Sequence, residues 1–409
     1  MKNNRINQAV IFSGGFGTRL KFLTKKTPKP LLEFDNVKFL DYVLLNLFKY
    51  GFKDIIILCH FKYEKFFKYY HNKKIGDMKI QCIKEKEPLG TGGALFNIKK
   101  KLKNIFIVCN GDTYIDFNII SFLRSFKNKN ILVGLQGTND SKFKKVIVKD
   151  KLVKKFSNQK CNKNDLFNTG YVIMRKSCLK FEKNFKFNLE FDFFNNYIQK
   201  KRIHYFNIDK KKNFIDIGTV KDYYRAKKFF RVKNNKPFII LDRDGVINHD
   251  TGYLSNVKDL SFIKGIEMLV KFFNNYDIPI FVITNQSAVA RGIISEKKLR
   301  EINYKIIDYM YKNNCFLNQI YYCPHHVDAK IIKFRKNCNF RKPNIGFFEK
   351  LKKDWNLKSN NAVMIGDKLS DIEFAKKSNI FGILFDKPSS NIFKTVLNNN
   401  KIAKILKYI

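Results

Sequence analysis

Short apolar segments with the composition of buried strands alternate with segments of helical periodicity along this chain, and the alternation starts twice. It starts first at residues 8–13 (QAVIFS) and continues through 54–59 (DIIILC). After a polar, basic segment at 231–237 (RVKNNKP), it starts again at 238–242 (FIILD). Strands that alternate with helices predict parallel α/β sheets. Because the alternation starts again with a new strand at residue 238, we expect a second domain. We place the two domains at residues 1–233 and 234–409.

Length and charge narrow the class of protein. At 409 residues the chain is long enough for two or three domains of about 150 residues each. The formal net charge is +45, but lysines are spread over the whole length and no nucleic-acid-binding motif accompanies them. We therefore expect no nucleic acid partner. We also expect the positive field to attract phosphorylated substrates.

The cysteines and the apolar segments indicate the cellular setting. The eight cysteines are mostly single and lie in or beside apolar strands, which favours reduced, buried thiols. The first apolar run is too short for a signal peptide, and no segment is long enough to span a membrane. The basic tail at 387–409 is typical of a solvated terminal helix. These features predict a cytoplasmic protein without a membrane partner, and they leave the oligomeric state open.

A glycine-rich loop follows the first strand directly. Bare backbone amides in such a loop can approach an anion without Cβ clashes. Further along, Lys29 stands between two prolines, which stiffen the backbone and hold its ammonium toward the loop. This loop contains Gly14, Gly15, Gly17 and Thr18, and its backbone amides could hold an anion.

Together these segments resemble the signature of the sugar-1-phosphate nucleotidyltransferases. The resemblance implies a Rossmann-like, GT-A-type sheet in which Arg19 and Lys29 clamp a triphosphate during in-line attack. It also implies that Gly14, Gly15, Gly17 and Thr18 contact the nucleotide. The segment at 87–94 (EPLGTGGA) is similar to the family's base and ribose loop, with Gly90 and Thr91 at the nucleotide. Asp112 and Asp216 follow strands and would hold Mg²⁺ by the same resemblance.

Sugar recognition follows from the same resemblance. Asn168 and Gly170 match the family's N-x-G sugar loop, and Glu190 lies in its L-E-x-D segment, where it would accept hydrogen bonds from sugar hydroxyls. Residues 156–159 (FSNQ) depart from the F-x-E-K found in many members, so we assign no sugar-phosphate contact there. The wording of the motifs is closest to members that act on D-glycero-D-manno-heptose 1-phosphate with GTP.

The second domain opens with two aspartates at the end of a strand. Residues i and i+2 of an extended segment face the same way, so Asp242 and Asp244 can address one phosphorus beyond the carboxyl end of the strand. One carboxylate can attack the phosphorus while the other donates or accepts a proton. Later strands end in polar motifs at 283–286 (ITNQ) and 365–371 (IGDKLSD), and 341–343 (RKP) brings cationic charge.

This half resembles phosphatases of the haloacid dehalogenase (HAD) type. The resemblance implies Asp242 as nucleophile, Asp244 as acid and base, and Lys342 as the cation on the phosphoryl oxygens. Thr284 would also contact the phosphoryl group. Mg²⁺ would be held by Asp242, Asp367 and Asp244, the last through its backbone carbonyl, and we expect phosphate or substrate contacts from Asn285, Arg341 and Lys368.

Within that superfamily, the motifs resemble the heptose bisphosphate and histidinol-phosphate phosphatases, which often carry structural zinc. Cys323, His325 and Cys338 match three of the zinc ligands, and Phe340 stands where the fourth belongs. His326 or water would have to complete the tetrahedron. The sequence therefore leaves zinc binding open.

The two resemblances combine into one expected function. A phosphatase that removes the 7-phosphate of heptose 1,7-bisphosphate would deliver the heptose 1-phosphate that the first domain converts, with GTP, to a nucleotide sugar for surface polysaccharide synthesis. One alternative joins a mannose-1-phosphate guanylyltransferase to a histidinol-phosphate-like phosphatase. Another is a nucleic-acid-binding or regulatory protein built on degenerate enzyme folds, against which the intact catalytic carboxylates argue.

Overall fold

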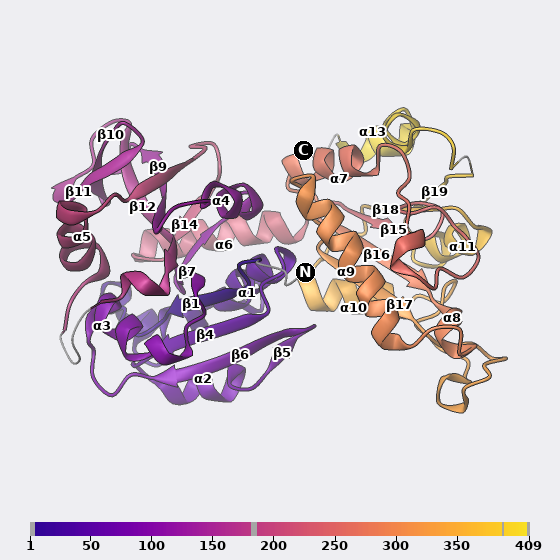
Figure 1. The fold of residues 1–409 in the computed structure, drawn as a ribbon, viewed down its shortest axis with the longest axis horizontal. Helices are drawn as coiled ribbons and strands as arrows, with labels where there is room; N and C mark the ends of the chain where they lie inside the picture. Colours follow the sequence, from indigo (N-terminus) through magenta and orange to yellow (C-terminus); the bar gives the residue numbers. More distant parts are fainter. Residues whose placement is uncertain (1–4, 181–185, 387, 407–409) are drawn as a thin grey trace. The chain divides into compact units, whose positions relative to one another are not determined.

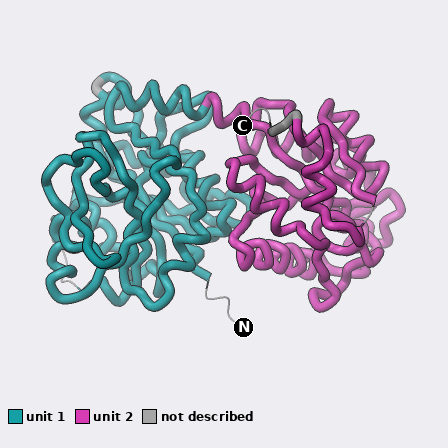
Figure 2. Tube along the Cα trace, turned by 90° about the horizontal axis from the view of Figure 1, so that it is seen from above, with its two compact units in different colours: residues 1–230 teal, residues 231–409 magenta. Residues whose placement is uncertain are grey.

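The computed structural model describes residues 5–180, 186–386 and 388–406. It divides into two compact units, Met1–Phe230 and Arg231–Ile409 (Figure 2). Helix α6 (Val220–Asn234) runs through this division, so the boundary expected after residue 233 falls inside the same helix.

The first unit is built on a ten-stranded mixed sheet (Figure 1). Its spatial order is β10 (Lys144–Lys149), β11 (Leu152–Lys160), β13 (His204–Ile208), β9 (Ile131–Thr138), β12 (Asp165–Arg175), β7 (Ile105–Asn110), β1 (Gln8–Phe12), β4 (Asp54–Cys59), β6 (Met78–Lys84) and β5 (Lys74–Ile75). Two small sheets join β14 (Phe214–Asp216) to β8 (Thr113–Ile115) and β2 (Glu33–Phe34) to β3 (Val37–Lys38).

Parallel pairing at the centre of this sheet positions the first site. Strand β1 pairs in parallel with β4 and β7, with Val10 opposite Ile56 on one side and Val108 on the other. The carboxyl ends of these strands therefore meet at one edge, where α/β sheets bind their ligands. The helices of this unit before α6 are α1 (Phe39–Lys49), α2 (Tyr63–Tyr70), α3 (Gly90–Asn97), α4 (Ile119–Ser125) and α5 (Asn195–Lys200).

Helix α1 illustrates how the local sequence determines an element. The sequence of residues 38–51 (KFLDYVLLNLFKYG) has helical periodicity, which predicts a helix with one apolar face that stops at Gly51. Five residues of that face are buried, Phe39, Leu40, Val43, Leu44 and Leu47, whereas the sixth, Phe48, is only partly buried. Gly51 follows the helix with a φ of +83°, and its N–H donates to the Phe48 carbonyl. This is the glycine stop that the sequence predicts.

The second unit contains a five-stranded parallel sheet in the order β17 (Gln319–Cys323), β16 (Ile280–Asn285), β15 (Phe238–Leu241), β18 (Ala362–Gly366) and β19 (Phe381–Leu384). Its helices are α7 (Ile266–Asn275), α8 (Ser287–Ala290), α9 (Glu296–Lys312), α10 (Gly346–Trp355), α11 (Leu369–Lys377), α12 (Ile392–Leu397) and α13 (Asn400–Leu406).

Both faces of this second sheet are covered. Along β15, Ile239 and Leu241 belong to one buried cluster, while Phe238 and Ile240 belong to another. Successive side chains of a strand point to opposite faces, so a strand buried on both sides reads as an unbroken apolar run. The run FIIL before Asp242 is such a strand, and the parallel sheet covered on both faces confirms the predicted α/β class for this half.

The cysteines and helices also bear on the expected setting. All eight cysteines are free and buried, as predicted. Among the described residues, no helix has the length and apolar character needed to cross a bilayer.

Candidate active sites

The first site is a cavity of about 370 Å³ at the carboxyl edge of β1, β7 and β6. Six of the residues predicted for nucleotide, catalytic or metal contacts line it, namely Gly14, Gly15, Lys29, Gly90, Thr91 and Asp112. Gly90 has a φ of +71°, and a Cβ there would lie 2.5 Å from the Phe187 carbonyl oxygen. Only glycine fits this close approach of two backbones.

The two predicted metal-binding aspartates lie together beside this cavity. Strands β8 and β14 pair so that Asp216 is opposite Thr113, and the Ile217 N–H donates to the Asp112 carbonyl. Burial and the nearby charge of Asp112 raise the pKa of Asp216. Lys29 Nζ lies 3.3 Å from Asp112 Oδ2. Two carboxylates with cationic neighbours suit a site that takes up a divalent cation and phosphates.

Arg19 also approaches this group of carboxylates. A Cβ added at Gly218 would lie 3.7 Å from the guanidinium of Arg19 and 2.7 Å from Asp216 Oδ2. Thr18 and Arg19 lie in the short 3₁₀ segment Thr18–Thr24. Gly17 directly precedes this segment and has a φ of 68°. These three residues do not line the cavity itself, so their substrate contacts remain predictions.

The predicted sugar residues come together on adjoining segments. A side-chain hydrogen bond joins Glu190 to Asn168, and burial raises the pKa of Glu190 to about 7 despite that bond. Thr91 Oγ1 accepts a hydrogen bond from the Leu189 N–H at 3.0 Å, which ties the nucleotide loop to the segment that carries Glu190. Gly170 has a φ of +82° and packs against Asn110 in the cavity wall.

Sequence reasoning missed one carboxylate of this cavity. Glu85 lies at its wall, and a Cβ added at Gly14 would meet Glu85 Oε2 at 3.1 Å. Burial raises the pKa of Glu85, and His60 opposes the shift. The signal that could have identified Glu85 was its position directly after β6, at the same sheet edge as the glycine loop.

The second site lies beyond β15 in the other unit. Lys342 Nζ lies 2.9 Å from Asp242 Oδ1 and 2.6 Å from Asp371 Oδ1, and all three side chains are almost fully buried. Burial raises the pKa of Asp242, and Lys342 partly opposes the shift. A buried carboxylate held by a buried ammonium is the arrangement expected of a nucleophile that receives a phosphoryl group.

One oxygen from each of Asp242, Asp367 and Asp371 lies within 4.8 Å of the others. Asp367 Oδ1 is buried without a hydrogen-bond partner, as expected of an atom that takes a cation. These hard oxygen donors fit Mg²⁺. Asp371 belongs to the quoted IGDKLSD motif but was not among the predicted metal residues.

The Asp244 side chain is held by several neighbours. Arg243 Nη2 lies 2.9 Å from each oxygen of its carboxylate, and Gln286 and Asn248 donate to it at 2.7 and 2.9 Å. Burial acts to raise the pKa of Asp244, but Arg243 and these hydrogen bonds outweigh it and leave the pKa below its usual value. The predicted metal contact of Asp244, through its backbone carbonyl, stays a prediction.

The other predicted phosphatase residues are arranged in different ways. Asn285 accepts from the Lys342 N–H and donates to the Lys342 carbonyl, both at 3.0 Å, so it holds the backbone of Lys342. Thr284 Oγ1 accepts from Gln286 at 2.9 Å. Lys368 forms an ion pair with Asp250, and Arg341 donates to the His325 carbonyl. Their phosphate contacts stay predictions.

Cys323, His325 and Cys338 converge, with one donor atom of each within 4.8 Å of the others. Within the described part of the chain, no fourth cysteine, histidine or carboxylate joins this group. His326 instead accepts a hydrogen bond from the Asp328 N–H. Phe340 packs its ring on Phe347. The donor set therefore fits zinc with three protein ligands.

The comparisons with known proteins identify the class of each half. The nucleotidyl transferase family model matches residues 8–233, and a HAD-hydrolase-like model matches residues 339–402. The chain belongs to the nucleotidyl transferase family, and its second unit is a HAD-type phosphatase domain. The protein is thus a bifunctional enzyme.

Three relatives make the assignment more specific. The chain is 37% identical over 220 residues to a D-glycero-alpha-D-manno-heptose 1-phosphate guanylyltransferase of Campylobacter jejuni, which covers 53% of this chain and 97% of the relative. It is 34% identical over 158 residues to a D-glycero-beta-D-manno-heptose-1,7-bisphosphate 7-phosphatase of Rhodopseudomonas palustris, and the aligned region covers 39% of this chain and 88% of the relative. It is 32% identical over 176 residues to a D-glycero-alpha-D-manno-heptose-1,7-bisphosphate 7-phosphatase of C. jejuni, and the aligned region covers 41% of this chain and 95% of the relative.

Proposed function

We propose that this protein carries out two consecutive steps. Its second unit removes the 7-phosphate of D-glycero-α-D-manno-heptose 1,7-bisphosphate. Its first unit converts the resulting heptose 1-phosphate and GTP to GDP-heptose and pyrophosphate. The GDP-heptose is a precursor of surface polysaccharide. The observation that carries this proposal is the presence, in one chain, of two separate carboxylate sites whose relatives are named for successive intermediates. The named relatives favour heptose over mannose 1-phosphate.

We assign the α anomer to the phosphatase substrate because the product of the first step must be the substrate of the second. The phosphatase relatives include enzymes for both anomers, whereas the guanylyltransferase relative is named for the α anomer. Removing the 7-phosphate leaves the anomeric carbon unchanged, so the phosphatase substrate must already have the configuration that the transferase accepts. Because GTP is the co-substrate, we place the reaction in the cytoplasm.

In the phosphatase step, an Asp242 oxygen attacks phosphorus and the sugar oxygen leaves. Lys342, 2.9 Å from Asp242, neutralises phosphoryl oxygens as charge shifts toward them. Asp244 then activates the water that hydrolyses the aspartyl phosphate. Its contact with Arg243 keeps it ionised, which suits this second half-reaction. To protonate the leaving sugar oxygen in the first half-reaction, Asp244 must loosen that contact.

In the transferase step, a phosphate oxygen of the heptose 1-phosphate attacks the α-phosphorus of GTP and pyrophosphate leaves. Lys29 and Arg19 face the carboxylates of Asp112 and Asp216, where the triphosphate would lie. Catalysis of this kind depends on positioning and on neutralising phosphate charge. Asn168 and Glu190 would orient the sugar hydroxyls.

Mg²⁺ is the cofactor proposed for both sites. Asp112 and Asp216 would hold it in the transferase. Asp242, Asp367 and the backbone carbonyl of Asp244 would hold it in the phosphatase, with Asp371 as a further carboxylate of the same group. When bound, the cation polarises phosphate oxygens and offsets the charge that develops in the transition state. We also propose Zn²⁺ at Cys323, His325 and Cys338, with water as the fourth ligand.

Glu85 supports guanine as the base. A carboxylate can accept two hydrogen bonds from the N1–H and the exocyclic amine of guanine, and adenine presents no such pair of donors. Glu85 lies in the wall of the nucleotide cavity beside the glycine loop. We therefore propose that Glu85 contributes to the preference for GTP.

The test is a reconstitution with the full chain. The protein is incubated with heptose 1,7-bisphosphate of the α or the β configuration, Mg²⁺ and each nucleoside triphosphate in turn. Phosphate, pyrophosphate and nucleotide sugar are then quantified. We expect all three products with the α anomer and GTP. Release of phosphate without any nucleotide sugar from either anomer would contradict the coupled pathway.

A further inference from the structure

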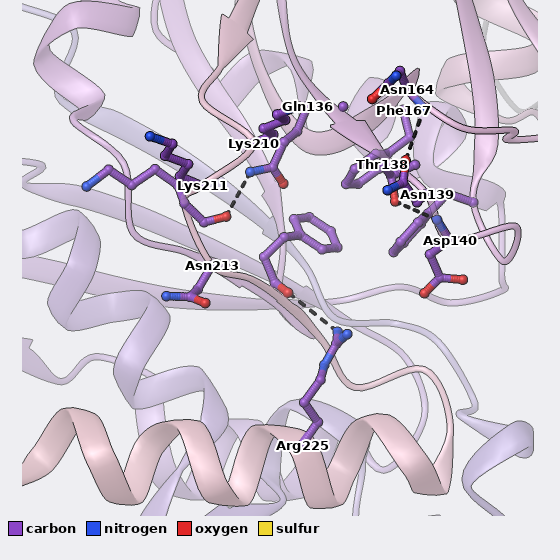
Figure 3. A pocket seen from close by; sticks show the side chains of 14 residues that line it. Gln136, Thr138, Asn139, Asp140, Asn164, Phe167, Lys210, Lys211, Asn213 and Arg225 are labelled. Carbon is purple, nitrogen blue, oxygen red and sulfur yellow. Dashed lines mark hydrogen bonds between the residues drawn. The ribbon is translucent and has the colours of Figure 1, made fainter.

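A second cavity in the first unit shares no residue with the nucleotide cavity. Its volume is about 520 Å³, which is within the range of small-molecule sites. Its walls come from the end of β9 and the loop after it, the start of β12, the loop before β14, and helix α6 (Figure 3). Its lining includes Gln136, Asp140, Lys210, Lys211, Lys212 and Arg225.

Hydrogen bonds hold the walls of this cavity in place. Gln136 is buried and donates to the carbonyls of Asp209 and Lys212 at 2.9 and 2.8 Å, which ties β9 to the loop before β14. The Asn164 N–H donates to Asn139 Oδ1 across the opposite wall. The cavity is therefore formed before any ligand arrives, and binding need not order the backbone.

The charges around the cavity favour an anion. Four cationic side chains line it, Lys210, Lys211, Lys212 and Arg225, against the single carboxylate of Asp140. The amide side chains Asn139, Asn164 and Asn213 add neutral hydrogen-bonding groups. Cations together with amides suit a phosphate group attached to a polar body.

One wall residue also connects this cavity to the transferase carboxylates. Arg225 Nη2 lies 3.6 Å from Asp222 Oδ1, and Figure 3 shows Arg225 rising from helix α6 toward the other lining residues. Asp222 Oδ1 lies 2.7 Å from Lys142 Nζ, and Lys142 Nζ lies 3.6 Å from Asp216 Oδ2. The path Arg225, Asp222, Lys142, Asp216 is thus a continuous chain of ion pairs.

We propose that this cavity binds a phosphorylated small molecule and that its occupancy alters the environment of Asp216. An anion beside Arg225 competes with Asp222 for the guanidinium. Lys142 is then the only cation left to Asp222 among the ion pairs described above, which draws Lys142 away from Asp216. With less neutralisation, Asp216 binds a divalent cation more readily, so the transferase needs less Mg²⁺ for its half-maximal rate. This role lies beyond the two catalytic steps.

The binding test uses hydrogen–deuterium exchange of the full chain, because this readout separates the cavity from both active sites. Inorganic phosphate, glucose 6-phosphate and GMP serve as probes for a free phosphate, a sugar phosphate and a nucleotide. At least one should slow exchange in segments 138–143 and 209–214. In Lys210→Glu/Lys211→Glu the same protection should need about tenfold more probe, as expected for the loss of charge-assisted contacts.

The matched control is Lys227→Glu/Lys228→Glu, which makes the same charge change at two exposed positions of α6 outside the cavity. The control should keep wild-type protection. If it loses as much as the cavity variant, or if no probe protects either segment, the binding proposal is overturned.

The coupling test uses Arg225→Gln, which removes the charge that reaches Asp222. The bound probe should lower the Mg²⁺ concentration for half-maximal transferase rate in the wild type and leave it unchanged in this variant. A wild-type response in Arg225→Gln would overturn the proposed route. Protection without any response in the wild type would overturn the coupling.

Discussion

Lys342 Nζ lies 2.9 Å from Oδ1 of Asp242, and both side chains are removed from solvent. The same ammonium reaches Asp371, so one buried cation serves two buried carboxylates. Replacing Lys342 by Met keeps most of the apolar side chain and removes the ammonium charge. We expect the phosphatase rate to fall about 100- to 1000-fold, the range seen when one electrostatic contact of a transition state is lost.

The same Lys342→Met variant should also have a lower melting temperature, because two buried carboxylates lose their partner. Lys350→Met is the control, since it removes an exposed pair with Asp354 and should change neither property. Phosphate release and thermal unfolding are measured on both variants, with transferase activity as the test of folding. Unchanged phosphate release in Lys342→Met would contradict the role of this lysine.

Independent sites predict crossed effects of two conservative substitutions. Asp242→Asn removes the attacking oxygen and should abolish phosphate release while the transferase keeps its activity on heptose 1-phosphate. Asp112→Asn should lower GDP-heptose formation by at least about 100-fold and spare phosphate release. Assaying each reaction separately checks both variants. If either substitution silenced both reactions in a folded protein, the sites would not be independent.

Glu85 is expected to set part of the nucleotide preference. Glu85→Gln keeps the shape of the side chain but replaces one acceptor oxygen by a donor. We expect the kcat/KM for GTP to fall about tenfold or more, with a smaller change for ATP, because a buried donor left without an acceptor costs about 1–3 kcal/mol. Competition between the two nucleotides measures the ratio. Equal losses for both would indicate a role in packing.

Glu190 predicts a pH dependence of stability. Burial raises its pKa from 4.5 to about 7, so the folded state binds a proton that the unfolded state releases over this interval. The contribution of this group is therefore fully present below pH 4.5 and is lost as the pH rises through about 7. Glu190→Gln should raise the melting temperature relative to wild type more at pH 8 than at pH 5, on a scale set by the pKa shift.

Two further observations test the assignment of Glu190. Its ionised form accepts hydrogen bonds from sugar hydroxyls, so the KM for heptose 1-phosphate should fall as the pH rises through 7, and Glu190→Gln should remove this dependence. Asp192→Asn is the control on the same helical segment. A pH-independent difference in melting temperature would show that Glu190 does not carry the raised pKa.

The incomplete zinc site predicts opposite effects of two substitutions. Cys338→Ser removes one of three converging donors and should abolish stoichiometric zinc in the purified protein. Phe340→Cys introduces a thiol at the position where related phosphatases have their fourth ligand, and it should slow zinc loss to a chelator. Elemental analysis and chelator competition measure both. Zinc-free wild-type protein after expression in zinc-supplemented medium would contradict the site.

Much of the fold was predictable because its signals are local. The unbroken run FIIL reads as a strand buried on both faces, and β15 is such a strand. The periodicity of residues 39–49 and the glycine at 51 predict α1 and its end, as observed. The exposure of Phe48 was not predictable, because helical periodicity places a residue on a face but does not specify how far neighbouring segments cover it.

The sites divide in the same way. By itself, the sequence determined the reaction class, and it predicted most of the side chains proposed for catalysis, since these follow strand ends in a recognisable order. Only the tertiary structure decided that Arg243 holds Asp244 and that Asp371 joins Asp242 and Asp367. It also decided that Cys323, His325 and Cys338 converge, with no fourth protein donor among the described residues. It alone also formed the cationic cavity around Gln136 and Arg225. Each of these contacts joins side chains whose approach depends on how strands, loops and helices pack, and no local pattern in the chain encodes that distance.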